Sequence, residues 1–312
     1  MTLFVRWASA ATDLLTFPIS HSGMSGASAV VELSHGFIVV ANDEDNQLRL
    51  YKTLEEGAPI SLVDLSKFLQ VSGPNLEADI EGAARIGSQI YWIGSHGRSK
   101  DGRLRPNRFR FFATEISGTA EKPVLKPSGL PCRTLLQQLC AEPTLADLHL
   151  AEAAAMSPDK SGALNIEALA PGPNGSVYIG FRSPVPKGLA LIIPLTNPKA
   201  VIAGQPARFG APIFLDLDGR GLRDMTWDGH TWYLIGGGNG SENRSPKLYK
   251  WHGPNRSPKV LPLRGLKNLN PEAITLLASH SPPSLLLCSD DGSSKTKNAS
   301  SFRSLRIQLS TH

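Results

Sequence analysis

The chain has 312 residues, of which 29 are glycine, 24 are proline and 19% are charged. This composition is typical of short strands joined by many turns, and it excludes a predominantly helical or disordered protein. The net charge is +5, but the Lys and Arg residues are scattered without a basic stripe interleaved with aromatics, so we expect no nucleic acid partner. No apolar stretch reaches the roughly 18 residues of a spanning helix, so we expect no membrane span.

The three cysteines indicate a reducing compartment. Cys132 and Cys140 lie eight positions apart in a predicted helix, which is too far for a disulfide, and Cys288 ends a predicted strand. We therefore predict a cytoplasmic protein, although the sequence leaves export open. All-β chains of this length often form one domain, so we predict a single domain over residues 1–312.

Strand patterns begin near the N-terminus and then recur in units. The first unit places residues 37–41 ahead of the polar loop Asn42-Asp43-Glu44, with Ser28 at its start. Each of the next four units opens with a four-residue signature that contains an acid, followed by a β-rich run and a polar loop. These signatures are Asp79-Ile80-Glu81-Gly82, Asn165-Ile166-Glu167-Ala168, Leu222-Arg223-Asp224-Met225 and Asn270-Pro271-Glu272-Ala273. Strand-rich repeats of this length predict an all-β fold, the β-propeller.

Most units contain four strand-like runs, and the gaps at the two ends of the chain complement each other. The fifth unit lacks a fourth run because the chain stops at His312, whereas the run at residues 14–19 precedes the first unit without a partner. We predict that this N-terminal run completes the last blade and closes the ring, which removes an exposed sheet edge. The number of repeat units favours five blades, and a six-bladed ring is the alternative if residues 118–162 contain a degenerate unit.

Residues 130–157 interrupt the strand pattern and predict a helical insertion. Leu135, Leu136 and Leu139 fall at helical spacing, and a second apolar face follows Pro143, which separates the two. Two roles are open for this insertion: it caps one side of the propeller, or it forms a lid over the channel mouth.

Propeller geometry places the acids of the signatures around the mouth of the central channel. The innermost strand of each blade starts at this face, and the loop between the second and third strands returns to it. We therefore predict two sets of site residues at the mouth. The carboxylates are Glu81, Glu167, Asp224 and Glu272, and the ligand-contacting loop residues are Asp43, His96, Arg98, Arg182, Asn239 and Asp290.

A ring of carboxylates needs compensation, because like charges at short range oppose joint ionisation. The four acids could bind Ca²⁺ or Mg²⁺, which prefer oxygen ligands. Glu81 could instead hold a proton and act with His96 in general acid or base catalysis. Two further alternatives would make the ring structural: neutralisation by Arg85, Arg182 and Arg223, or acceptance of backbone N–H groups from the neighbouring blade.

Several stretches carry a family resemblance. The most specific are Ser95-His96-Gly97-Arg98 and Gly219-Arg220-Gly221-Leu222-Arg223-Asp224, and with the first two signatures they resemble the bacterial domain-of-unknown-function family 3616 over roughly residues 25–310. The resemblance implies a propeller without an established activity. The Asp-x-Glu-Gly opening is also distantly similar to those of esterase-like phytases and other hydrolytic propellers, whose chemistry lies at the channel mouth. Ser28 departs from that pattern, because those hydrolases would have an acid in every blade.

The sequence therefore predicts a propeller whose acidic mouth binds a small polar or anionic molecule. The candidate reaction is hydrolysis of an ester or phosphoester assisted by a divalent cation, with His96 and Glu81 as the catalytic residues. The rival prediction is a non-catalytic propeller that serves as a binding or scaffolding module, with a protein partner as one occupant.

Overall fold

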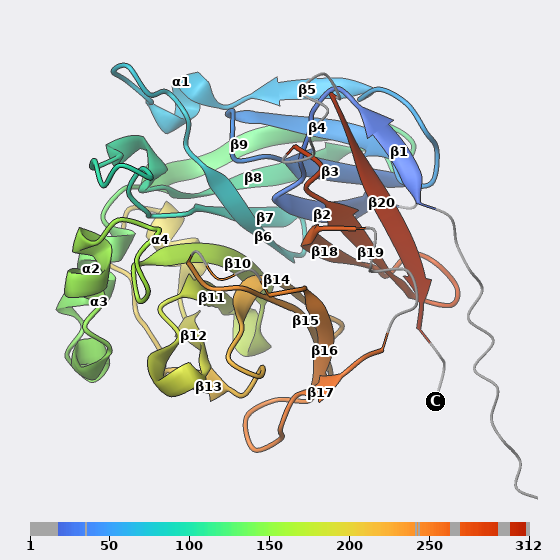
Figure 1. The fold of residues 1–312 in the computed structure, drawn as a ribbon. Coiled ribbons are helices and arrows are strands. Elements are labelled where there is room, and N and C mark those ends of the chain that lie inside the picture. The colour runs from blue at the N-terminus through green and yellow to red at the C-terminus, as the bar shows by residue number, and fades with distance from the viewer. Residues whose placement is uncertain are drawn as a thin grey trace, which may run out of the picture.

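The computed structural model describes residues 18–34, 36–240, 242, 244–262, 269–292 and 300–309. Within these residues the strands form five four-stranded antiparallel sheets, arranged as the blades of a propeller (Figure 1). The α-helices of this part of the chain are short: α1 (Ser66–Leu69), α2 (Leu135–Ala141), α3 (Leu150–Ala155) and α4 (Pro198–Ile202). None of them has the length and apolar character needed to cross a bilayer.

Each blade runs from an inner strand at the channel to an outer strand at the rim. Blade 1 contains β2 (Ala29–Ser34), β3 (Phe37–Ala41), β4 (Gln47–Lys52) and β5 (Ser61–Asp64). Blade 2 contains β6 (Ile80–Ile86), β7 (Gln89–Gly94), β8 (Phe111–Gly118) and β9 (Pro123–Cys132). Blade 3 contains β10 (Asn165–Pro171), β11 (Val177–Ser183), β12 (Ala190–Leu195) and β13 (Ile213–Leu215).

The last two blades follow the same order. Blade 4 contains β14 (Gly221–Trp227), β15 (Trp232–Gly237), β16 (Lys247–Trp251) and β17 (Lys259–Val260). Blade 5 contains β18 (Pro271–Leu277), β19 (Ser284–Ser289), β20 (Ser301–Gln308) and β1 (Ile19–Ser22). The inner strands contact one another in the cyclic order β2, β6, β10, β14 and β18, so the ring is closed.

The burial pattern follows from this arrangement. The middle strands β3, β7, β12 and β19 are almost fully buried, because neighbouring blades cover both faces of each sheet. Their sequences are accordingly rich in Val, Ile and Leu on both faces, as expected for strands packed on two sides. The outer strands β5 and β17 are mostly exposed. The core therefore lies in the seams between blades rather than at one central point.

The N-terminal strand closes the ring, as predicted, but it lies further along the chain. The strand β1 pairs with β20 from Ile19↔Ser304 to Ser22↔Ser301. Inside this pairing the ring of His21 stacks on Phe302, with 4.8 Å between centroids. The predicted run, residues 14–19, overlaps the observed strand only at its last residue, and residues 14–17 lie outside the described part. The predicted boundaries were wrong because β1 has the polar sequence Ser-His-Ser, which pairs through its backbone, buries only His21 and has no apolar pattern.

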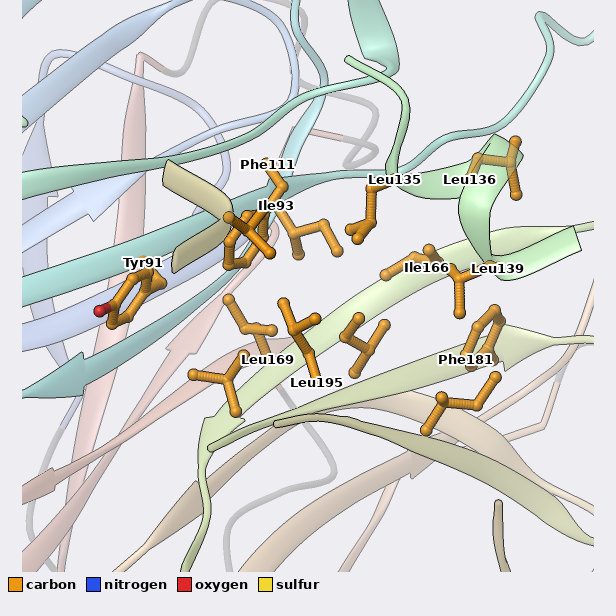
Figure 2. Packing of buried hydrophobic residues seen from close by; sticks show 14 of the residues in the cluster. Tyr91, Ile93, Phe111, Leu135, Leu136, Leu139, Ile166, Leu169, Phe181 and Leu195 are labelled. Carbon is orange, nitrogen blue, oxygen red and sulfur yellow. The ribbon is translucent and has the colours of Figure 1, made fainter. Parts of the chain in front are cut away.

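The helical insertion packs into the seam between blades 2 and 3. Leu135 and Leu139 of α2 are fully buried against a cluster that includes Phe111 of blade 2 and Ile166 of blade 3 (Figure 2). The stretch 118–162 thus consists of the fourth strand of blade 2 and this insertion, and it does not form a sixth blade. Both roles considered for the insertion, the cap and the lid, stay predictions.

Candidate functional site

Four inner strands carry a β-bulge close to their first residue. In β6 the register shifts at Glu81, which becomes the extra residue of the ladder. The extra residues of the next three blades are Glu167, Arg223 and Glu272. A bulge turns its extra side chain out of the regular alternation and re-aims it. These four side chains therefore occupy equivalent positions at one end of the channel, which we call the channel mouth.

In blade 4 the bulged residue lies one position before the acid of the signature. The alignment of the signatures matched Asp224 to Glu81, but Asp224 pairs with Ile235 in the ladder and Arg223 occupies the bulge. Asp224 is buried, and its Oδ2 accepts the N–H of Ile274 at 2.8 Å. Burial raises the pKa of Asp224 well above its ordinary range. Asp224 therefore links blades 4 and 5 through a backbone group, in the manner of the structural alternative.

Blades 3, 4 and 5 share a network of ion pairs at the mouth. Glu167 Oε1 lies 2.7 Å from Arg182 Nη1, and Glu167 Oε2 lies 3.0 Å from Arg223 Nε. Arg223 also forms an ion pair with Glu272 through its Nη2. The side chains of Glu167 and Arg223 are only 7% and 14% exposed, so solvent screens these pairs weakly. We call this network, made of Glu167, Arg182, Arg223 and Glu272, the arginine-paired half of the mouth.

Blades 1 and 2 bring three carboxylates together. Asp43 belongs to the loop between β3 and β4, Asp79 directly precedes β6, and Glu81 is the bulged residue; one oxygen of each lies within 4.8 Å of the others. Asp79 Oδ2 lies 3.0 Å from Arg108 Nη1. Among the described residues, the carboxylate of Glu81 has no hydrogen bond or ion pair. We call Asp43, Asp79 and Glu81 the acidic half of the mouth.

The surroundings of the acidic half favour neutral carboxyls over charged ones. Burial, with the nearby charge of Asp43, raises the pKa of Asp79 to about 7, although Arg108 acts in the opposite direction. Burial and the charge of Asp79 raise the pKa of Glu81 well above its ordinary range. Asp43 is exposed to the solvent of the mouth, but desolvation by surrounding atoms and the charge of Asp290 raise its pKa to about 6. The acidic half therefore favours uptake of protons or of a cation.

The acidic half departs from the pattern of two sister blades. In blade 3 the Nδ2 of Asn165 donates to Glu167 at 2.8 Å, and in blade 5 the Nδ2 of Asn270 donates to Glu272 at 3.3 Å. Blade 2 has Asp79 at the same position, two residues ahead of its bulged glutamate. An ionised carboxylate has no N–H to donate. The bulged glutamate of blade 2 therefore faces a second acid where its sisters receive a hydrogen bond.

His96 and Arg98 were predicted at the mouth, and the structure gives each a local role. His96 is 1% exposed, its Nδ1 lies 2.8 Å from the carbonyl oxygen of Gly94, and its ring stacks on Phe109. Burial lowers the pKa of His96 to about 4, so the imidazole is neutral at physiological pH. Arg98 donates to the carbonyl oxygen of Ala154 in α3. Within the described residues, neither side chain contacts a carboxylate of the mouth, and catalysis by His96 stays a prediction.

The remaining predicted loop residues flank the two halves. Arg182 pairs with Glu167, as described above, and also donates to the carbonyl oxygen of Gly238 beside Asn239. Asn239 itself donates to the carbonyl oxygen of Gly219 at 3.3 Å. Asp290 lies close enough to Asp43 to raise its pKa. The structure therefore places Asp43 in the acidic half, and Arg182 and Asn239 at the arginine-paired half, while the charge of Asp290 acts on both Asp43 and Arg223.

Two residues of the site were missed in the sequence. Asp79 stands inside the first signature, and the Asn residues at its place in two sister copies are the signal that could have singled it out. Arg108 gave no such signal, because its pairing with Asp79 and Glu77 depends on a long-range contact. Arg85, a candidate for neutralising the ring, instead donates to the carbonyl oxygens of Glu32 and Leu33.

The acidic half could hold a metal ion. Its donors are carboxylate oxygens, which hard cations such as Ca²⁺ and Mg²⁺ prefer. A bound cation would also remove the repulsion that raises the pKa values of these three acids. The chemistry of the donor set does not distinguish between the two ions.

The fold and the site define a five-bladed β-propeller with an acidic group at its mouth. The sequence matches the family described as "Protein of unknown function (DUF3616)" over residues 26–108 and 132–300, and the chain belongs to that family. Curated protein sequences give no match.

Solved structures of similar fold have diverse names. The Malassezia sympodialis allergen Mala s 1 is similar with a TM-score of 0.55 and 11% identity, covering 95% of this chain and 99% of the allergen. The glutaminyl cyclase of Myxococcus xanthus has a TM-score of 0.49 and 9% identity, with coverages of 95% and 96%. The PQQ-bound aldose sugar dehydrogenase of Streptomyces coelicolor has a TM-score of 0.46 and 11% identity, with coverages of 92% and 95%. At these identities the likeness concerns the fold alone.

Proposed function

We propose that the acidic half of the mouth binds a divalent cation, Ca²⁺ or Mg²⁺, and that the cation in turn binds a small polar or anionic molecule. The observation that carries this proposal is the convergence of Asp43, Asp79 and Glu81, one oxygen of each within 4.8 Å of the others, while Glu81 makes no hydrogen bond or ion pair among the described residues. Of the four ligands predicted from the sequence, the proposal keeps Glu81 and replaces the other three, whose carboxylates contact arginines or a backbone N–H.

The donor set leaves room for a ligand on the cation. One oxygen of Asp79 is shared with Arg108, so the three acids offer fewer oxygens than the six to eight that Ca²⁺ takes. Water or an anionic oxygen of a ligand would complete the coordination. Because Asp43 is exposed at the mouth, the open side of such a site faces solvent. These features suit reversible binding of a small molecule better than a closed structural metal site.

The reaction that fits such a site is hydrolysis of an ester or phosphoester. The cation would polarise the carbonyl or phosphoryl oxygen of the substrate. An oxygen of Glu81 not bound to the cation would take a proton from the attacking water. The water oxygen then bonds to the carbon or phosphorus, the bond to the alcohol oxygen breaks, and the leaving oxygen takes up a proton. His96 has no step in this scheme.

A second candidate is a non-catalytic binding propeller. The observation in its favour is that the titratable groups of the arginine-paired half are already used in ion pairs, and His96 is buried against Phe109. The mouth then offers one small group of acids for chemistry. Such a protein would bind a ligand through the cation without turning it over.

Calorimetric titration of EDTA-treated, dialysed protein with Ca²⁺ and Mg²⁺ tests the proposal. We expect one site, and Glu81→Gln should weaken it by about tenfold or more because a charged ligand is lost. The matched control is Glu272→Gln, which changes the equivalent bulged residue of blade 5 and should shift the affinity by less than about threefold. Turnover of ester and phosphoester substrates that requires both the cation and Glu81 supports the hydrolase. Binding without turnover supports the second candidate, and an absence of binding overturns both.

A further inference from the structure

A small pocket lies next to the acidic half, between the loop that precedes β6 and the loop that precedes β8. Its volume is about 190 Å³, and its lining includes Ser72, Glu77, Leu104, Arg105 and Asn107. Arg108, one residue beyond this lining, pairs with Glu77 at 2.6 Å and with Asp79 at 3.0 Å. A single arginine side chain therefore connects the pocket with the proposed cation site.

The walls of the pocket are held together without a ligand. The Nδ2 of Asn107 donates to the carbonyl oxygen of Ser72 at 2.8 Å, and the Oδ1 of Asn107 accepts the N–H of Ser72 at 3.3 Å. Asn107 is 8% exposed. On the other side, Arg110 donates to the carbonyl oxygen of Pro106 at 2.9 Å. The partly buried hydrogen bonds between Asn107 and Ser72 join the two loops, so the pocket is a formed site and not a gap between mobile segments.

Arg105 is the lining residue without a partner. Among the described residues its guanidinium makes no ion pair or hydrogen bond, and its Nε is buried without an acceptor. The guanidiniums of the neighbouring arginines do form ion pairs: Arg103 pairs with Asp101 at 2.6 Å, and Arg108, whose Nε also lacks an acceptor, pairs with Glu77 and Asp79. A buried N–H without an acceptor is unfavourable unless water or a ligand supplies one. Glu77 also lines the pocket, but its Oε1 contacts Arg108, and it does not accept the N–H of Arg105 Nε.

We propose that this pocket is an anion subsite in which Arg105 binds the terminal oxyanion, a phosphate or a carboxylate, of a small organic molecule. The forked N–H groups of a guanidinium match both oxyanions. The volume is smaller than the roughly 300 Å³ at which pockets for whole ligands begin, so it suits one functional group. The exposed side chain of Leu104 offers an apolar contact to the organic part. The inference rests on the proposed function in one respect: the other end of the same molecule would bind the cation of the acidic half.

Phenyl phosphate and benzoate are suitable probes, and their comparison shows which oxyanion the subsite takes. Titrations would use the protein with saturating Mg²⁺ and, in parallel, with EDTA. We expect at least one probe to bind the Mg²⁺-loaded protein, and Arg105→Gln to weaken it about tenfold or more, because a charge-assisted hydrogen bond is lost. Arg105→Lys should recover only part of the affinity, since it keeps the charge without the fork. The matched control Arg103→Gln, on the same loop, should change the affinity by less than about twofold.

The two proposals fail in distinguishable ways. Arg105→Gln should leave Mg²⁺ affinity within about threefold of the parent, whereas Glu81→Gln should weaken Mg²⁺ binding directly. If Mg²⁺ binds but both probes bind equally to the parent and Arg105→Gln proteins, or neither probe binds, the subsite is wrong and the cation site stands. If Mg²⁺ does not bind but a probe binds through Arg105, the subsite stands and the cation site is wrong.

Discussion

In blade 5 the bulged Glu272 pairs with Arg223, whereas in the described part of the chain the bulged Glu81 of blade 2 makes no hydrogen bond or ion pair and interacts with the charge of Arg223 only at longer range. The backbone is the same at both places, since each residue is the extra member of a bulge at the start of an inner strand. The side chains around the bulge differ. Asn270 donates to Glu272, but Asp79 adds a second charge beside Glu81.

This contrast separates acids that are paired with arginines from acids that face other acids within one repeat. An acid whose neighbours are amides and arginines is already compensated, and it joins blades together. An acid whose nearest charged neighbours are acids favours uptake of a proton or of a cation. The repeat alone cannot make this distinction, because both kinds of acid occupy the same register. The distinction depends on the residue two places earlier and on the loops of the adjacent blade.

Removing Arg223 should produce the largest effect in the mouth. Arg223→Gln removes the cation shared by the buried Glu167, which keeps Arg182, and the half-buried Glu272, and it should lower the free energy of unfolding by about 3 kcal/mol. Urea denaturation of the parent and the variant measures this decrease. The matched control is Arg103→Gln, which breaks a pair with Asp101 at 2.6 Å whose arginine is 78% exposed, and it should cost less than about 1 kcal/mol. Equal losses in the two variants would contradict the assignment of Arg223 as a structural cation.

The pH dependence of stability should expose the acidic half. Asp79 has a pKa of about 7 and Asp43 of about 6 in the folded protein, against an ordinary value of 3.8. The folded state therefore binds more protons than the unfolded state between about pH 4 and 7, so the stability of the metal-free protein should fall as pH rises through this window. In Asp79→Asn the decrease in stability across this pH window should be smaller than in the parent by on the order of 2 kcal/mol. Urea denaturation in EDTA across this range is the measurement, and identical pH profiles for parent and variant would refute the prediction.

A smaller effect should follow from giving blade 3 the acid of blade 2. Asn165→Asp removes the hydrogen bond to Glu167 and places a carboxylate there, which should cost about 1 kcal/mol. Because Arg182 and Arg223 already neutralise Glu167, the change should not create a second cation site. Calorimetry should still give one Ca²⁺ per chain. A stoichiometry of two would mean that the arginines do not decide the difference between the halves.

The architecture was predictable from the sequence because it depends on repetition. The signatures and strand-like runs recur in five units, and five blades are what the structure contains. The closing strand was predicted too early in the chain, because Ser20 and Ser22 are polar and a polar edge strand has no apolar pattern to mark it. Its register is set by backbone pairing with β20 and by the stacking of His21 on Phe302.

The site was less predictable because side-chain partners are long-range. The acids Glu81, Glu167 and Glu272 occupy the equivalent positions that the signatures indicated, but a bulge moved the fourth position from Asp224 to Arg223. A pattern of residue types does not reveal a bulge. The convergence of Asp43 with Asp79 depends on how the β3–β4 loop of one blade meets the next blade. Only the coordinates bring those residues together.

The location of a bound cation tests the central contrast most directly. Anomalous diffraction from crystals soaked in Mn²⁺, a hard cation that substitutes for Mg²⁺ and Ca²⁺, would show where it binds. We expect one peak in the mouth, about 2.0–2.6 Å from oxygens of Asp43, Asp79 and Glu81, and its loss in Glu81→Gln. A peak beside Glu167 and Glu272, or a mouth without any peak at saturating Mn²⁺, would contradict the division of the mouth into an acidic and an arginine-paired half.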